Sequence, residues 1–264
     1  MTSGATSPPY VEGHRLLLGK SVLVTAAAGT GIGFATARRC LEEGCRALMI
    51  SDVHERRLAT AVEQLRASSG SIDIQGRLCD VTKEEQVRSL IDEADRSLRG
   101  IDVLVNNAGL GGERRVVDMT DEEWSRVLEV TLTGTFRMTR AALAVMIPRQ
   151  RGAIINNASV LGWRAQKGQA HYAAAKAGVM ALTRCAALEA SEHGIRINAV
   201  APSIAMHEHL KRAASEELLQ RLAAGEAFGR AAEVWEVANV IVFLASDYAS
   251  YMVGEVVSVS SQHP

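Results

Sequence analysis

The chain has 264 residues, of which 47% are hydrophobic and 22% are charged, a composition typical of a globular protein with a sizeable core. Its formal net charge of −1 argues against nucleic-acid binding, which calls for a strongly basic face. No apolar run approaches the ~20 residues that cross a bilayer, and the first residues lack the apolar core of a signal peptide, so we expect a flexible N-terminal extension over 1–17 and a cytoplasmic protein.

Short apolar runs rich in β-branched residues alternate with longer helical patterns through the rest of the chain. This alternation predicts a single α/β domain over 18–264, a Rossmann-type doubly wound parallel sheet of seven strands with helices on both faces. We expect strands at 21–25, 46–51, 72–79, 101–106, 153–159, 195–200 and 255–259. We expect helices at about 31–44, 55–68, 83–98, 121–148, 171–192 and 233–245.

The interval 203–229 interrupts this alternation with a long connection that has a helical pattern of its own. A long insertion beside a sheet edge is often a substrate loop or lid, and the alternative is a surface helix packed on the domain. The four cysteines, Cys40, Cys45, Cys79 and Cys185, lie in apolar segments without the spacing of a metal site, so we expect buried free thiols and no metal.

A glycine-rich turn, "VTAAAGTGIG", leads from the first predicted strand into a helix. Gly29, Gly31 and Gly33 allow a tight turn and close approach of the backbone, and the helix start offers N–H groups to a pyrophosphate. Asp52 ends the second strand, 19 residues after Gly33, where a dinucleotide-binding unit places an acid for the ribose hydroxyls.

Asp52 also bears on the choice of nucleotide. Two like charges ~4 Å apart repel by roughly 4 kcal/mol at an effective dielectric constant of ~20, so an acid here resists the 2′-phosphate of NADP. The sequence therefore favours NAD, without excluding NADP. His54, Arg56 and Arg57 follow closely and are either phosphate partners or part of a solvated helix face.

Further along the chain, "CDVT" brings Asp80, "NNAG" spans Asn106 to Gly109, "NNASVLG" brings Ser159, and "HYAAAK" brings Tyr172 and Lys176. Ser159 precedes Tyr172 by 13 residues and Lys176 follows it by four. In this order and spacing the motifs resemble the classical short-chain dehydrogenases/reductases over about residues 18 to 260. The resemblance implies the cofactor-binding residues Thr25, Gly29, Thr30, Gly31, Ile32, Gly33, Asp52, Asp80, Val81, Asn107, Ala108, Gly109, Tyr172, Lys176, Pro202 and Ile204.

The chemistry accounts for the residue types. Hydride transfer between a carbinol carbon and nicotinamide needs a group that exchanges the hydroxyl proton near neutral pH. A free tyrosine has a pKa near ~10, and we expect the Lys176 ammonium, one helical turn from Tyr172, to lower it toward ~7 in a site dried by bound cofactor. By resemblance, Lys176 also contacts the nicotinamide ribose, and Ser159 holds the substrate oxygen against the phenol.

Three positions depart from the family pattern. Thr131 stands where the family has an asparagine that anchors a proton-relay water, so we include Thr131 among the catalytic candidates while its relay role is in doubt. After the sixth strand, Ser203 and His207 replace a glycine and a threonine. The glycine turn has one residue more than the commonest form, and Ala26 occupies a usual glycine position.

Within the family, these motifs and the tail "VVSVSSQHP" are similar to actinobacterial reductases/dehydrogenases of hydroxy-indene-carboxyl-CoA thioesters, which act in degradation of steroid rings C and D. That resemblance implies oxidation of a ring hydroxyl on a bicyclic acyl-CoA. Apolar residues and cations near the ends of strands four to six are either substrate contacts or lid packing and solvated charge. The substrate candidates are Leu110, Ser159, Leu161, Trp163, Arg164, Tyr172 and His207, and further cations are Lys167, His209, Lys211 and Arg212.

Two other functions compete with this hypothesis. One is a 3-oxoacyl-[acyl-carrier-protein] or 3-oxoacyl-CoA reductase, and the other is a catalytically silent nucleotide-binding regulator, which the presence of both Tyr172 and Lys176 disfavours. By resemblance, the helices at 121–148 and 171–192 form a dimer seam in a homotetramer. The alternative is that their apolar faces are buried within one subunit.

Overall fold

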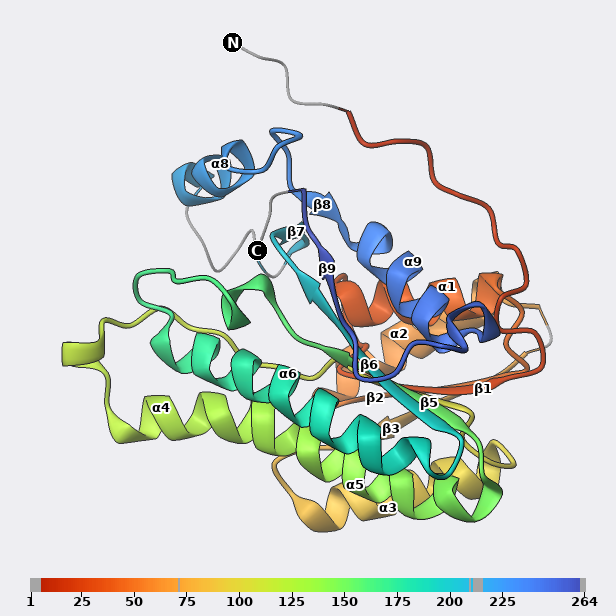
Figure 1. Cartoon of the computed structure of the whole chain (residues 1–264). Helices are drawn as coiled ribbons and strands as arrows, with labels where there is room; N and C mark the ends of the chain where they lie inside the picture. The colour runs from red at the N-terminus through yellow and green to blue at the C-terminus, as the bar shows by residue number, and fades with distance from the viewer. Residues whose placement is uncertain (1–5, 71, 209, 211–215, 262–264) are drawn as a thin grey trace.

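The fold is a parallel sheet between two layers of helices (Figure 1). The computed structural model describes residues 6–70, 72–208, 210 and 216–261. Seven parallel strands lie in the order β3-β2-β1-β4-β5-β6-β9, which confirms the predicted doubly wound sheet. The strands are β1 (Ser21–Thr25), β2 (Ala47–Asp52), β3 (Asp73–Leu78), β4 (Val103–Asn106), β5 (Gly152–Asn157), β6 (Ile195–Pro202) and β9 (Val256–Val259).

The two larger of the three apolar clusters among the described residues lie on the two faces of the sheet, because successive side chains of a strand point to opposite faces. In β1, Val22 and Val24 belong to the core with α1, α2 and α9, and Leu23 belongs to the core with α3, α5 and α6. The helices are α1 (Ile32–Glu42), α2 (Glu55–Ser68), α3 (Glu84–Ser97), α4 (Asp121–Leu128), α5 (Gly134–Met146), α6 (Ala170–Ser191), α8 (Glu216–Ala224) and α9 (Val234–Ala245). No helix of the described residues is both long and apolar enough to span a membrane.

The prediction of a single helix over 121–148 is wrong in one respect. A π-helical segment, Glu129–Thr133, separates α4 from α5, and a 3₁₀ turn, Ile147–Arg149, ends the run. A π segment widens one turn without needing glycine or proline, so the apolar periodicity does not reveal it. Where the chain resumes as α5, Gly134 packs so closely that a Cβ there would lie 2.6 Å from Val81 Cγ2.

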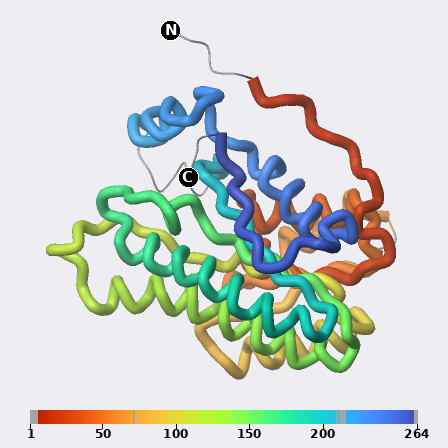
Figure 2. Tube along the Cα trace, in the orientation of Figure 1, coloured from red at the N-terminus to blue at the C-terminus, as the bar shows by residue number. Residues whose placement is uncertain are grey.

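The connection 203–229 contains α8, as the pattern predicts, and Figure 2 shows α8 standing away from the layered body. Two short strands that the sequence did not reveal, β7 (Ala205–Met206) and β8 (Ala232–Glu233), pair at its base. Their two-residue length is too short for a periodic signal. Cys40, Cys45 and Cys79 are buried thiols, but Cys185 is exposed on α6, so the expectation of four buried cysteines is wrong for that one.

The described part of the N-terminal extension lies along α1 and α9 (Figure 1). The Tyr10 ring stands edge-on to Trp235 with 5.3 Å between centroids, and Glu43 accepts hydrogen bonds from the backbone N–H groups of His14 and Leu16. Leu17 is fully buried. These contacts attach residues 10–17 to the domain, whereas the flexibility expected of the extension stays a prediction.

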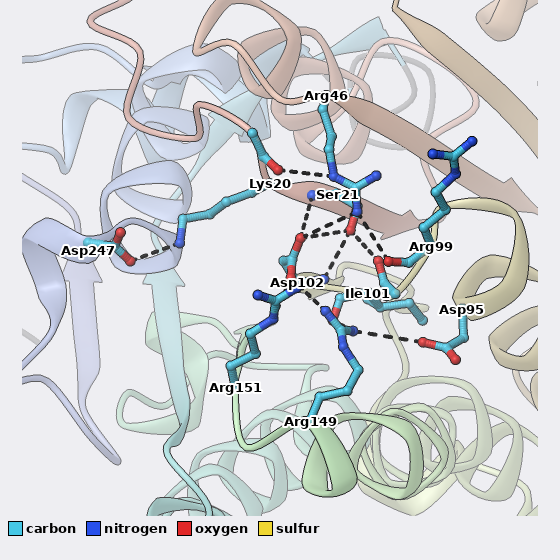
Figure 3. A network of polar contacts seen from close by, with 12 residues as sticks. Lys20, Ser21, Arg46, Asp95, Arg99, Ile101, Asp102, Arg149, Arg151 and Asp247 are labelled. Carbon is cyan, nitrogen blue, oxygen red and sulfur yellow. Dashed lines mark hydrogen bonds and ion pairs between the residues drawn. The ribbon is translucent and has the colours of Figure 1, made fainter.

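Asp102 joins the amino ends of three neighbouring strands (Figure 3). Its Oδ2 accepts hydrogen bonds from the backbone N–H and the hydroxyl of Ser21, each 3.0 Å long, at the start of β1. Its Oδ1 lies 2.8 Å from the Arg149 guanidinium and 3.4 Å from that of Arg151, both just before β5. Burial raises the pKa of Asp102, but the Ser21 hydrogen bonds and the two arginines outweigh it, so the net pKa is lowered.

We predict that Asp102→Asn lowers the free energy of unfolding by about 2 kcal/mol, because it removes the charged acceptor of the hydrogen bonds from Ser21 and from the partly buried Arg149. The folded-state pKa is lowered, so this stabilisation is present above the unfolded-state pKa of ~3.9 and is lost as pH falls through the folded value. Urea unfolding at pH 7 and at lower pH measures both effects.

The matched control is Asp118→Asn, which removes an exposed ion pair with Arg115 and should cost less than ~1 kcal/mol. An Asp102→Asn protein as stable as wild type at pH 7 would contradict the role of Asp102 as a junction.

Candidate active site

An open cavity of about 1240 Å³ lies at the carboxyl ends of the central strands. The order of the sheet reverses between β1 and β4, and such switch points bind ligands in doubly wound folds. Among the residues predicted from the sequence, the cavity is lined by Gly29, Thr30, Gly31, Ile32, Gly33, Asp52, Asp80, Val81, Asn107, Ala108, Gly109, Leu110, Tyr172, Lys176 and His207.

The glycine turn has the geometry of a phosphate cradle. Gly29 has a φ of +146°, which other residues rarely adopt, and a Cβ at Gly33 would lie 2.5 Å from the Ala26 carbonyl oxygen. Gly31 lies at the start of α1, and no described side chain caps this end of the helix. The N–H groups of the first turn of α1 therefore face the cavity without a side-chain acceptor. Ala26 has a φ of +49°, the left-handed conformation that explains why a glycine is usual there.

Asp52 is buried at the end of β2 and lines the same cavity. Its Oδ2 accepts the backbone N–H of Ala28 at 3.2 Å, and its Oδ1 accepts that of His54 at 3.1 Å. Burial raises the pKa of Asp52, although the Ala28 hydrogen bond and the Arg57 charge partly oppose the rise. Arg57 lies 3.8 Å from Oδ1 and also lines the cavity, so the acid and the cation act on the same part of a ligand.

A chain of polar contacts joins β1, β4 and β5 to α6. The Thr25 hydroxyl accepts the backbone N–H groups of Asn107 and Ala108 at 3.0 and 3.1 Å. The side chain of Asn107 then accepts a 2.9 Å hydrogen bond from the Asn157 amide. The Asn157 carbonyl accepts a 2.5 Å hydrogen bond from Lys176 Nζ. Thr25 therefore acts behind the cavity wall rather than in its lining, and Asn157 is a site residue that the sequence reasoning did not single out.

Ser159, Tyr172 and Lys176 lie together beside the cavity. Ser159 follows β5 and hydrogen-bonds to the side chain of Tyr172, while its Oγ also accepts the Leu161 backbone N–H at 3.2 Å. Lys176 Nζ lies 5.5 Å from the centre of the Tyr172 ring, as expected for residues one turn apart on α6. The spacing in the sequence thus corresponds to one group of side chains in space.

The expected lowering of the Tyr172 pKa does not occur in the protein alone. Burial raises the pKa of Tyr172, and the Ser159 hydrogen bond only partly opposes it. Burial also lowers the pKa of Lys176 to about 8. The expectation took the lysine charge into account but not the cost of burying a phenolate, which here is larger.

Thr131 is fully buried in the π-helical segment and does not line the cavity. Its Oγ1 accepts the Leu110 backbone N–H at 3.0 Å and donates to the Leu110 carbonyl at 3.2 Å. Gly109 separates this hydroxyl from Lys176, since a Cβ there would lie 3.4 Å from Nζ and 3.8 Å from Oγ1. These contacts make Thr131 a support for the Leu110 loop, and a role in proton relay stays a prediction.

The remaining candidates lie around the cavity rather than in its lining. Leu161 belongs to a 3₁₀ turn after Ser159, Trp163 is exposed, and Arg164 contacts Ser260 at 3.3 Å. Pro202 ends β6, and the Ile204 carbonyl accepts the Ala232 backbone N–H at 2.9 Å. Of the further cations, Lys167 is exposed, and His209, Lys211 and Arg212 lie outside the described residues.

Several lining residues carried no signal in the sequence because they come from segments that meet only in the fold. Leu210 lies in the connection after β7, and Leu218 and Leu222 are on α8. Arg126 and Val130 lie one turn apart before the α5 junction. Glu113, Gln166 and Gln169 come from the loops before α4 and α6. Within the described residues, no cluster of histidine, cysteine and carboxylate side chains suits a metal ion.

Comparison with known proteins gives concordant results. A family model described as enoyl-(acyl carrier protein) reductase matches residues 26–261. The chain is 62% identical over 261 residues to a Mycobacterium tuberculosis protein named (5R,7aS)-5-hydroxy-7a-methyl-1-oxo-2,3,5,6,7,7a-hexahydro-1H-indene-carboxyl-CoA reductase, covering 98% of this chain and 99% of that one. It is 37% identical to a 3-oxoacyl-[acyl-carrier-protein] reductase of Thermotoga maritima, covering 92% and 97%.

Solved structures agree with this. The crystal structure of a short chain dehydrogenase from Mycobacterium smegmatis superposes with a TM-score of 0.87 at 58% identity, covering 98% of this chain and 99% of that one. The parallel sheet, the glycine turn and the Ser159–Tyr172–Lys176 group agree with these similarities. The chain therefore belongs to the short-chain dehydrogenase/reductase family.

Proposed function

We propose that this oxidoreductase uses NAD to interconvert a ring alcohol and a ketone on a bicyclic, steroid-derived acyl-CoA. The observation that carries the chemistry is the Ser159–Tyr172–Lys176 group at the cavity that the glycine turn and Asp52 also line. The 62% identity to the indene-carboxyl-CoA reductase supports the substrate class, and the name of that relative gives the reducing direction. Leu110, Leu210, Leu218 and Leu222 provide an apolar lining suited to fused rings.

The cavity fits the nucleotide. A Cβ at Gly29 or Gly31 would meet no protein atom, so this part of the lining is open to a pyrophosphate. Asp52 would accept hydrogen bonds from the hydroxyls of the adenosine ribose, and Asp80 and Val81 after β3 would contact the adenine. Oxidised nicotinamide bound here would supply the hydride acceptor.

The side chains divide the chemistry of proton transfer. Asn157 holds Lys176 Nζ in place, and with the nucleotide bound the lysine charge would favour the phenolate form of Tyr172. Ser159 positions the substrate oxygen against the Tyr172 oxygen, which as the phenolate takes the hydroxyl proton of the alcohol while the hydride leaves the carbinol carbon. In the reverse direction, the phenol returns this proton to the carbonyl oxygen.

We also propose a homotetramer in a reducing cytoplasm. Three large apolar side chains, Trp124, Phe136 and Leu188, are exposed on α4, α5 and α6, which supports burial of these helices against another subunit. The buried free thiols of Cys40, Cys45 and Cys79 support a reducing compartment. Light scattering after size-exclusion chromatography tests the assembly, and a 28.3 kDa monomer would contradict it.

The first prediction from this proposed function concerns the substrate. With NAD(H), the bicyclic hydroxy-acyl-CoA and its ketone should be converted with a kcat/KM at least about tenfold above that of a linear 3-oxoacyl thioester, a difference of ~1.4 kcal/mol in transition-state binding. Absorbance at 340 nm measures both directions. A higher kcat/KM with the linear thioester would favour the 3-oxoacyl reductase function, to which the Thermotoga relative points.

The second prediction concerns the proton carrier. Tyr172→Phe should lower kcat by about a thousandfold, because it removes the hydroxyl that exchanges the proton, and should leave NAD affinity within about threefold. Steady-state rates and fluorescence titration with NAD measure the two quantities. Tyr251→Phe, which alters a fully exposed tyrosine, is the control. Retained turnover in Tyr172→Phe would refute the mechanism.

The third prediction concerns the nucleotide. Asp52→Asn should reduce the preference for NAD over NADP, expressed as the ratio of kcat/KM values, by at least about tenfold, because it removes the charge that repels a 2′-phosphate while Arg57 remains. Asp92→Asn changes an exposed carboxylate on α3 and should leave the ratio unchanged. An unchanged ratio in Asp52→Asn would show that the selectivity originates elsewhere.

A further inference from the structure

The last described residues of the chain, 259–261, contact three segments around the cavity. The Val259 carbonyl accepts the Ser203 backbone N–H at 3.1 Å, where the connection after β6 begins. Arg164, in the loop after Ser159, donates to Ser260 Oγ at 3.3 Å. The Oε2 of Glu226, just after α8, accepts both the N–H and the hydroxyl of Ser261, at 3.2 and 2.9 Å. We call residues 259–261 the tail clasp.

Glu226 is the unusual member of this set, because the residue is buried, with 6% of its surface exposed. A buried carboxylate is unfavourable unless hydrogen bonds or charges compensate for the lost water, so its position is tied to the partners that provide them. Two of those partners are the donors of Ser261 on a single residue of the tail clasp. The contact is therefore specific for one arrangement of these segments.

Among the described residues, backbone contacts also hold the connection that carries α8. Backbone pairing of β7 with β8 and the hydrogen bond from Ala232 to Ile204 hold the base of the connection. Glu226 lies between this base and α8, four residues after Leu222, which lines the cavity together with Leu218. Glu226 is thus a side-chain anchor directly next to the helix that carries these two leucines.

We propose that Glu226 is a positioning residue for substrate binding: by binding Ser261 it holds α8 where Leu218 and Leu222 form the cavity wall. Ser260 extends the same link to Arg164, so one short segment fixes α8 and the loop after Ser159 relative to each other. The link acts on the binding of the acyl substrate and not on the nucleotide site, which the glycine turn and Asp52 form. This consequence for binding rests on the proposed function, whereas the structural link does not.

Hydrogen–deuterium exchange tests the link without any substrate. In Glu226→Ala, the backbone amides of α8 should exchange about tenfold faster than in the wild type, the effect of losing hydrogen bonds to a charged acceptor. Ser261→Ala, which removes one of the two donors and leaves the interior intact, should give a smaller increase of about threefold. Glu226→Gln keeps an acceptor oxygen and should restore most of the protection.

Glu217→Ala is the matched control, because Glu217 is an exposed carboxylate on the same helix. Its exchange should equal that of the wild type. If α8 exchanges equally in Glu226→Ala and in the wild type, or if Glu217→Ala speeds exchange as much, the proposal is overturned. A uniform increase over the sheet as well as α8 would indicate general destabilisation and would also overturn it.

Kinetics test the consequence for binding. With the thioester that the wild type converts best, Glu226→Ala and Ser261→Ala should raise the KM for the thioester about tenfold and threefold, with kcat and the KM for NAD each within about twofold. An equal increase in the KM for the thioester and the KM for NAD would refute a role in substrate binding. If the wild type converts neither thioester, the proposed function fails, and the exchange experiment still decides on the link.

Discussion

The active site depends on a run of hydrogen bonds that joins the carboxyl ends of β1, β4 and β5 to α6. Thr25 fixes the backbone after β4, Asn107 connects to Asn157, and the Asn157 carbonyl holds Lys176. Side-chain amides and a hydroxyl make these links, and each one bridges elements far apart in the sequence. The glycine-lined cavity and the α6 residues Tyr172 and Lys176 are thereby tied together, as the proposed hydride transfer between two bound molecules requires.

At the amino ends of the same strands, the charged side chain of Asp102 holds the sheet together. Asp102 binds Ser21 at the start of β1 and the arginines before β5 (Figure 3), so the strands that deliver the site residues are held at both ends. In the proposed function, α8 and the loop after Ser159 lie on the substrate side, and their described contacts to Ser261 and Ser260 lie outside this frame. Different sets of described contacts thus hold the nucleotide side and the substrate side of the proposed site.

The sequence alone was sufficient to predict the structure where a local pattern determines it. The strands follow from buried apolar runs, and the glycine turn follows from backbone conformations that only glycine adopts readily, as at Gly29. It was insufficient where distant segments meet. Nothing local indicates that Asn157 faces Lys176, that Leu218 lines the cavity, or that burial raises the pKa of Tyr172. The π-helical segment at Thr131 was missed because it contains no glycine or proline that would mark a break in the apolar pattern.

That π-helical segment constrains how this enzyme can change in evolution. A wide turn arises when one extra residue is accommodated within a helix, and it rotates everything that follows relative to what precedes. Point substitutions cannot return the helix to a regular form, because the residue count decides it. A deletion that straightened it would move Thr131 away from Leu110 and turn the α5 face that packs on Val81. Variation in this part of the chain should therefore consist of exchanges of residue type at constant length.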